Sequence, residues 1–182
     1  MSIVTLIGNP KAGSRTHTVA VKAAEAVGRA AGREEAAEVV DLSALGSALL
    51  APGASAAVEL ALETVTAADV LVVASPTYKG TYTGLLKSFL DRLPGGALQK
   101  TVALPLLVMG SPRHALAVEL HLRPLLVELG AVVPTPGLAV LESELPRLDE
   151  VLDEWAARIA PQVAVALRAP LVNIALQEGS RA

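Results

Sequence analysis

The sequence predicts an α/β protein with a five-stranded parallel sheet in the order 2-1-3-4-5 and helices on both faces. First, short apolar runs alternate five times with longer segments of helical periodicity. Such alternation is typical of βαβ units with right-handed crossovers. Second, the run at residues 70–74 is apolar at every position, as expected for a strand that is buried on both faces of a sheet.

The elements are expected in the following order. Strands are predicted at residues 2–7, 38–42, 70–74, 101–109 and, in part, 132–140. Helices are predicted at 14–31, 56–67, 82–93, 113–129 and 148–167, with a loop or helical turn at 43–50. Gly32, Pro52 and Pro94 lie where helices end or the chain turns. Pro105 lacks the N–H of a strand's hydrogen-bond ladder, so we expect a bulge there.

Length and composition indicate one domain. With 182 residues, 52% of them hydrophobic, the chain can form a single core, so we expect one domain over residues 1–170 and a C-terminal tail at 171–182. The tail is expected to fray or to pack on a partner subunit. No apolar run is long enough to span a bilayer. The first apolar run has no basic segment before it, so we expect a cytoplasmic protein.

Charge and residue types exclude several functions. A net charge of −3 argues against a nucleic-acid partner, which requires clustered Lys and Arg. The absence of cysteine excludes disulfides, thiolate metal ligands and a cysteine nucleophile. His17, His114 and His121 fall in different segments, so we expect no metal site.

The loop after the first strand predicts a phosphate site. Its sequence, GNPKAGSR at residues 8–15, departs from the GxxxxGK[ST] loop of nucleoside triphosphatases and lacks GxGxxG. Ser14, Arg15, Thr16 and Thr18 nevertheless combine hydroxyls and a guanidinium with the free amides of a helix N-terminus. These groups suit a phosphate monoester. The alternative is that Ser14 or Thr16 only caps the helix.

The loop after the third strand predicts a site for a planar ring. Pro76 fixes the backbone as it leaves the sheet, Gly80 and Gly84 permit close approach, and residues 77–81 carry several amides. Ligands of open α/β sheets bind at the carboxyl ends of the strands. The two loops together therefore predict a phosphorylated planar ligand, which we interpret as flavin mononucleotide (FMN).

Three loops in order resemble the NADPH-dependent FMN reductases of two-component monooxygenase systems, with the alkanesulfonate-utilisation reductases among them. They read GNPKAGSRT, SPTYKGTYTGLLKSFLDRLP and MGSPRHALAVELHLRPLL, and the resemblance runs from the first strand to about Leu141. It implies a flavodoxin-like fold and hydride transfer from NADPH, with NADH possible, to N5 of FMN. Reduced flavin then passes to a partner monooxygenase. Because the flavin carries this chemistry, no catalytic side chain is expected.

The resemblance also implies which residues bind the cofactor. The phosphate segment is Ser14, Arg15 and Thr16, with Asn9 where a serine is common. The segment along the isoalloxazine edge is Pro76, Thr77, Tyr78, Lys79 and Gly80, and the third loop places Gly110, Ser111 and His114 beside the ring. Lys79 either offsets charge near N1 of the reduced flavin or binds the NADPH 2′-phosphate, unless it is only a solvated loop lysine. Arg113 is its rival for that phosphate.

Two other functions stay open, namely an NAD(P)H quinone or azo reductase with bound FMN and a non-catalytic flavodoxin-like electron carrier. Carriers often hold their ring between aromatic side chains, which are scarce here, so an enzyme with one open flavin face is favoured. We expect a homodimer or homotetramer, and the apolar stripe of the 82–93 helix suits either the core or a dimer contact.

The helix that contains His121 raises a separate question. In some related reductases the corresponding helix carries an inserted residue and a π-type bulge at the tetramer interface. The sequence leaves open whether this chain has such an insertion. The more ordinary expectation is that His121 is hydrogen-bonded to a neighbouring helix.

Overall fold

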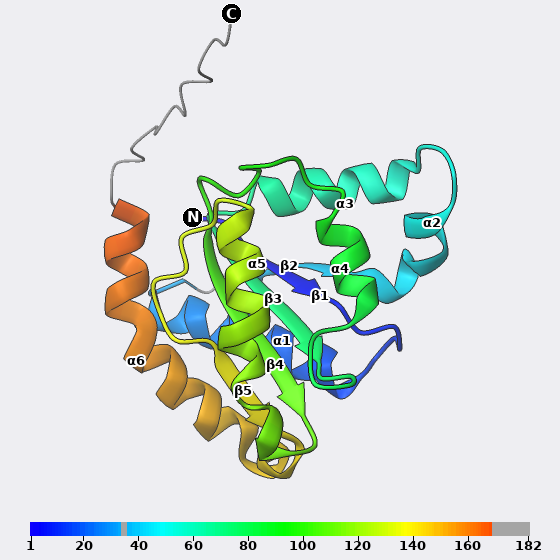
Figure 1. The fold of residues 1–182 in the computed structure, drawn as a ribbon. Coiled ribbons are helices and arrows are strands. Elements are labelled where there is room, and N and C mark those ends of the chain that lie inside the picture. Colours follow the sequence, from blue (N-terminus) through cyan, green and yellow to red (C-terminus); the bar gives the residue numbers. More distant parts are fainter. Residues whose placement is uncertain (34–35, 169–182) are drawn as a thin grey trace, which may run out of the picture.

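The computed structural model describes residues 1–33 and 36–168, and the prediction for the tail at 171–182 lies outside them. Its centre is a five-stranded parallel sheet (Figure 1). In sheet order the strands are β2 (Glu38–Asp41), β1 (Ile3–Ile7), β3 (Val70–Pro76), β4 (Val102–Met109) and β5 (Leu138–Leu141). The predicted order 2-1-3-4-5 is therefore confirmed.

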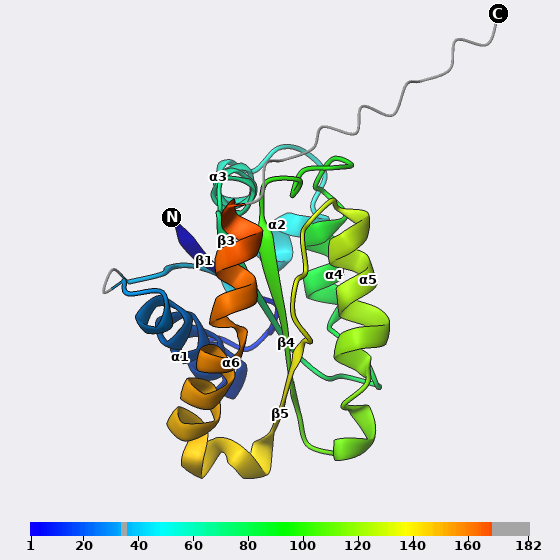
Figure 2. The same ribbon diagram turned by 90° about the vertical axis from the view of Figure 1, so that its left-hand side faces the viewer.

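Helices cover both faces of this sheet (Figure 2). On one face lie α1 (Arg15–Ala30) and α6 (Leu148–Arg168). On the other lie α2 (Gly46–Leu50), α3 (Ala56–Thr66), α4 (Gly84–Leu90) and α5 (Arg123–Glu128). Shorter segments are η1 (Leu42–Ala44), η2 (Pro112–His114), η3 (Val118–Leu122) and η4 (Glu142–Arg147). Within the described ranges, no helix is both long and apolar enough to cross a membrane.

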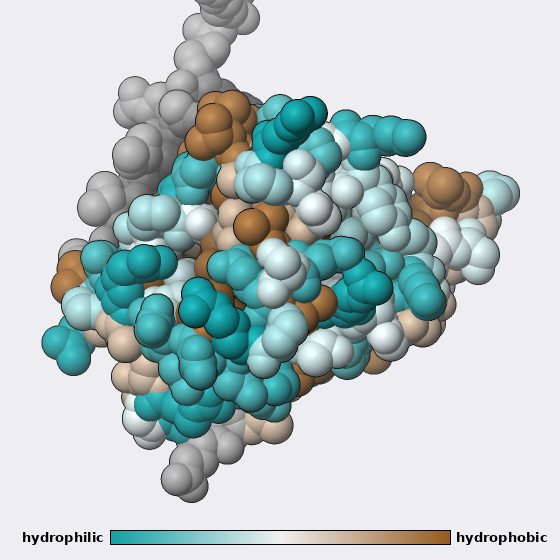
Figure 3. All heavy atoms as spheres, turned by 90° about the horizontal axis from the view of Figure 1, so that it is seen from below, coloured by the Kyte–Doolittle hydropathy of each residue, from teal (hydrophilic) through white to brown (hydrophobic). Residues whose placement is uncertain are grey.

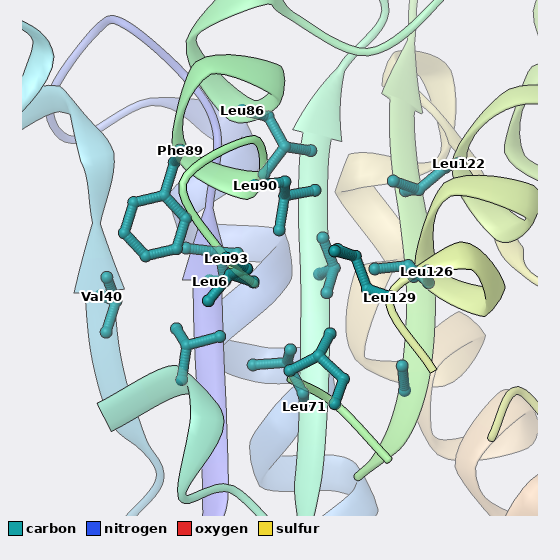
Figure 4. Close-up of a cluster of buried hydrophobic side chains, with 14 of the residues drawn as sticks. Leu6, Val40, Leu71, Leu86, Phe89, Leu90, Leu93, Leu122, Leu126 and Leu129 are labelled. Carbon is teal, nitrogen blue, oxygen red and sulfur yellow. The ribbon is translucent and has the colours of Figure 1, made fainter. Parts of the chain in front are cut away.

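Alternate strand residues divide the core in two, because successive side chains of a strand point to opposite faces. Leu6 and Leu71 pack with Phe89 of α4 and Leu126 of α5 on one face (Figure 4). The other face packs against α1 and α6, where small buried residues such as Ala23 of α1 let the helix approach the sheet closely. The apolar stripe of α4 was expected to serve either the core or a dimer contact. Its residues are mainly buried, so the stripe belongs mainly to the core.

The bulge that the sequence predicted at Pro105 is wrong. Residues 102–108 of β4 pair one for one with 70–76 of β3. The amide of Ala103 donates to Val132 on the β5 side, and Pro105, two residues further on, faces that same side. β5 begins only at Leu138. On the β5 side, β4 therefore has no paired strand at the level of Pro105 to which an N–H would donate.

The segments before and after this point also differ from the sequence prediction. The expected fifth strand is reduced to β5 and an isolated bridge between Val132 and Val102. The expected helix at 113–129 is divided into η2, η3 and α5, and η3 is a π-helix in which the amide of Arg123 donates to Val118, five residues earlier. Pro124 accounts for the change, because its ring cannot follow a regular α-helical turn and it donates no hydrogen bond.

Candidate functional site

The candidate site lies at the carboxyl ends of β1, β3 and β4, which point to the lower side of Figure 1. Figure 3 views the molecule from that side and shows a mainly hydrophilic face with apolar patches between the polar groups. β1 and β3 are neighbours, and the Gly8 amide donates to the Ala74 carbonyl over 2.8 Å. The two loops predicted to bind one ligand therefore leave the sheet side by side.

The first loop carries two hydroxyls whose hydrogens are still free to form hydrogen bonds. Ser14 caps α1, and its Oγ accepts from the His17 amide over 3.2 Å. Thr16 Oγ1 accepts from Asn9 Nδ2 over 3.1 Å. Both bonds use oxygen lone pairs and leave the hydroxyl hydrogens for an acceptor. The capping role weighed as an alternative is thus real for Ser14, and it is compatible with binding an anion.

Backbone amides add to these donors. The first amides of a helix have no partner within the helix, and in the described residues those of Arg15 and Thr16 form no other hydrogen bond. Asn9 is buried and uses both ends of its amide, because Oδ1 accepts from the Lys11 amide over 2.9 Å. Asn9 thus braces the loop through its side-chain hydrogen bonds to Thr16 and Lys11.

Arg15, the first residue of α1, supplies a guanidinium at the end of the first loop. Its Nη1 lies 2.6 Å from Glu142 Oε2, and the two side chains keep 64% and 46% of their exposure. Glu142 begins η4, immediately after β5. Local sequence patterns do not indicate this partner, because 127 residues separate the two groups in the chain.

The second loop closes in a tight turn from Tyr78 to Thr81. The two residues exchange backbone hydrogen bonds of 2.9 and 3.3 Å, and the central residues Lys79 and Gly80 have φ values of 53° and 86°. Two consecutive positive φ values are typical of a type I′ turn. Lys79 is the one residue other than glycine with positive φ in the described chain, and such strained positions concentrate at ligand sites.

The hydrogen bonds of this loop reduce the number of backbone amides that it can offer to the edge of a ring. The amide of Thr77 donates to Val108 in the sheet, and those of Tyr78 and Thr81 are used within the turn. The amides of Lys79 and Gly80 form no hydrogen bond in the described chain. They are therefore two backbone donors of this loop that are free to meet a ligand.

A buried threonine that the sequence prediction missed joins the two loops. Thr83 caps α4 by accepting from the Leu86 amide over 3.1 Å, and its hydroxyl donates to the Gly8 carbonyl. Its own amide donates to Ser75 Oγ over 3.0 Å. Thr83 thus fixes the phosphate loop and the start of α4 relative to each other. A threonine two residues before a helical apolar run is a recognisable N-cap signal.

The third loop follows β4. Gly110 is exposed, with no atom in the way of a β-carbon. Ser111 Oγ accepts from the Arg113 amide at 3.4 Å, and the His114 amide donates to the Ser111 carbonyl at 3.2 Å, so both residues belong to η2 and its cap. The three predicted residues therefore share one loop, beside the end of β3.

The π-helix η3 comes next and is held by an ion pair. Glu119 Oε2 lies 2.5 Å from Arg123 Nε, and its other oxygen accepts from the Gly137 amide. Partial burial opposes ionisation of Glu119, but the bonds from Arg123 and Gly137 outweigh it and lower its pKa. Arg123 also donates to the carbonyls of Val133 and Thr135. His121 is exposed and its side chain forms no hydrogen bond within the described chain, so the expected bond to a neighbouring helix is not made within this chain.

The donor set fits FMN. A phosphate monoester needs donors and positive charge, which the hydroxyls of Ser14 and Thr16, the first amides of α1 and Arg15 supply. A flavin ring edge carries carbonyl and ring-nitrogen acceptors, and the free amides of Lys79 and Gly80 are donors. No cluster of three or more His, Asp or Glu side chains able to hold a metal ion occurs in the described part of the chain.

Comparison with known sequences agrees with this fit. The family model described as NADPH-dependent FMN reductase matches residues 1–144. The chain is 36% identical over 135 residues to an FMN reductase (NADPH) of Pseudomonas aeruginosa, with 74% of this chain and 72% of that protein covered. It is 35% identical over 133 residues to the NADH-dependent FMN reductase SfnF of Pseudomonas fluorescens, with coverage of 73% and 70%.

Solved structures agree as well. An oxidoreductase from Corynebacterium diphtheriae superposes with a TM-score of 0.78 at 32% identity, with 92% of this chain and 97% of that chain covered. A flavodoxin, WrbA-like protein from Agrobacterium tumefaciens gives 0.62 at 19% identity, with 91% and 99% covered, and shows the flavodoxin-like fold alone. The chain therefore belongs to the NADPH-dependent FMN reductase family and is an oxidoreductase that uses FMN and NAD(P)H.

Proposed function

We propose that this chain transfers hydride from NADPH to FMN at the carboxyl edge of its sheet and supplies the reduced flavin to a partner monooxygenase. The observation that carries the proposal is the junction of the first two loops. Thr83 and the Gly8 amide fix the phosphate-type donors of one loop beside the strained turn of the other. One ligand with a phosphate tail and a flat head matches both sets of donors.

The first loop binds the phosphate in this proposal. The hydroxyls of Ser14 and Thr16 and the amides of Arg15 and Thr16 donate to its oxygens, while the Arg15 guanidinium supplies charge. Asn9 orients Thr16 through its side-chain amide. These groups distinguish FMN from riboflavin, which has no phosphate.

The second and third loops position the ring. The Lys79 and Gly80 amides donate to its edge, and Pro76 and Thr77 end the strand that supports the turn. Gly110, Ser111 and His114, in the loop after β4, lie beside the ring in this proposal. When bound, FMN supplies N5 as the hydride acceptor. The protein's part is to orient the ring and to stabilise negative charge, for which the Lys79 ammonium is available.

The turnover experiment is anaerobic mixing of purified protein with NADPH or NADH and with FMN, FAD or riboflavin. Loss of nicotinamide and flavin absorbance is followed. The proposal predicts rapid oxidation of NADPH with FMN and slower reaction with riboflavin. Flavin that stays bound and passes electrons only to a quinone or azo dye would instead support the quinone or azo reductase. Negligible NADPH oxidation would support the electron carrier.

A homo-oligomer and a monooxygenase partner complete the proposal. Leu116, Leu120 and Val127 lie on η3 and its neighbouring segments with exposures of 68%, 65% and 54%. Exposed apolar side chains gathered on one segment are typical of contact surfaces. We assign this surface to contact between copies of the chain. Because α4 buries its apolar residues in the core, we place the contact at 116–127 instead of at α4.

A further inference from the structure

Arg15 is shared between the phosphate site and a second structure. Along α1, the cations Arg15, Lys22 and Arg29 recur every seven residues and therefore lie on one face of the helix. Each pairs with a carboxylate across the seam with η4 and α6, namely Glu142, Asp149 and Asp153, and each pair has an N–O distance of 2.6 Å. Arg15 is the member of this ladder that also belongs to the first turn of α1.

From this arrangement we propose that Glu142 competes with the FMN phosphate for Arg15 and thereby weakens the binding of FMN. The inference rests on the proposed function, because it assumes that Arg15 meets the phosphate. Glu142 lies outside the three binding loops, and by this proposal it helps to set the affinity for FMN. A reductase that hands its flavin to another enzyme must release it, and an internal carboxylate that replaces the phosphate favours release.

The geometry supports exchange between the two partners. Both side chains are largely exposed, and exposed ion pairs are weak enough to break and re-form. Arg15 also borders a 480 Å³ cavity, shared with Thr18, Lys22 and residues 145–150, that leaves room for the guanidinium to move. The hydroxyls and amides of the loop have no such competitor in the described chain. Competition by Glu142 therefore removes the positive charge of Arg15 from the phosphate site and leaves the hydroxyl and amide donors in place.

The ladder also supplies a matched control. Lys22 of α1 and Asp149 of α6 form the same kind of surface ion pair, about 10 Å further along α1. Glu142→Gln and Asp149→Asn remove one carboxylate charge each. The binding of FMN and of riboflavin to each variant is measured by calorimetry, at one fixed salt concentration.

The expected result is selective. Exposed ion pairs contribute roughly 0.2–1 kcal/mol, so Glu142→Gln lowers the Kd for FMN by a factor of about 1.4 to 5. Riboflavin affinity stays unchanged, and Asp149→Asn changes neither. In an Arg15→Gln background the gain from Glu142→Gln disappears, because the contested cation is gone.

Four results would overturn the inference. These are unchanged FMN binding in Glu142→Gln, weaker FMN binding, an equal gain for riboflavin, and a gain that persists without Arg15. The last would mean plain charge repulsion instead of competition. Failure of the proposed function looks different, since the wild-type protein would then oxidise no NADPH with FMN. Failure of the phosphate assignment alone would appear as equal wild-type affinity for FMN and riboflavin.

Discussion

At the scale of single residues, we expect the positive charge of Arg15 to separate FMN from riboflavin. Arg15→Gln removes a charge-assisted contact with the phosphate, and the exposure of the side chain keeps its contribution modest. We expect the Kd for FMN to rise about tenfold and the Kd for riboflavin to stay the same, as measured by calorimetry. Arg29→Gln is the control, because Arg29 forms the same kind of pair far from the loop. Equal losses in both variants would remove Arg15 from the site.

Glu119 gives the stability of the protein a pH dependence. Its pKa is lowered in the folded state, so its contribution is fully present above the usual Glu pKa of about 4.3 and is lost as pH falls through the lower folded value. Asp69, whose pKa is lowered by the hydrogen bond from the Ser2 amide, acts in the same direction. Stability to urea should therefore decline below about pH 4.3.

The substitution Glu119→Gln isolates the contribution of Glu119 to this pH dependence. Glu119→Gln should lower the free energy of unfolding at pH 7 by about 1 kcal/mol, because it breaks the pair with Arg123. The difference from wild type should shrink as pH falls below 4, since the wild-type carboxylate is then protonated too. Glu128→Gln, at an exposed position on α5, is expected to change little. A constant difference from pH 7 to pH 3 would contradict this interpretation.

At the scale of elements, the start of α4 couples the two main loops. Thr83→Ala removes both the N-cap bond to Leu86 and the bond to the Gly8 carbonyl. We expect a loss of about 2 kcal/mol in the free energy of unfolding and weaker FMN binding, because the phosphate loop loses its tie to α4. Ser55 occupies the same N-cap position of α3 without a capping bond. Ser55→Ala should therefore leave both quantities unchanged, and equal effects of the two substitutions would refute the coupling.

Element types were predictable where periodicity and caps agree. Helices α1, α3, α4 and α6 and the five strands, the fifth in shortened form, follow from apolar spacing. Gly32, with φ of 69°, follows α1 as a C-terminal glycine should. Pro105 was misjudged because its environment depends on where another strand begins, 33 residues later. Apolar spacing does not decide whether this segment contains a π-helix, although Pro124 inside a helical pattern signals a local change in the hydrogen-bond ladder.

The site could be predicted only in part, for a similar reason. Ser14 and Thr16 lie at a helix start that the sequence marks, and the turn at Lys79 and Gly80 lies within a loop that the sequence singled out. Asn9 became a brace, and three amides of the second loop were used internally, which only the folded backbone decides. Glu142 depends on a contact between distant segments, which local patterns do not encode.

At the scale of the whole molecule, the exposed surface at 116–127 predicts self-association. Gel filtration with light scattering should show a dimer or tetramer at micromolar concentration. Leu120→Gln should shift the protein towards the monomer, because Leu120 is 65% exposed on η3. Leu60→Gln is the control, since Leu60 is equally exposed, at 64%, but lies on α3. A wild-type monomer, or equal effects of the two substitutions, would contradict this surface as the contact.

The most direct measurement for the molecule as a whole is a crystal structure with FMN bound. The phosphate should lie within hydrogen-bond distance, roughly 2.7–3.2 Å, of the hydroxyls of Ser14 and Thr16 and of the first amides of α1. The edge of the ring should meet the amides of Lys79 and Gly80. A phosphate bound elsewhere, or a ring that does not touch the turn at Tyr78–Thr81, would contradict the claim that these two loops hold one flavin.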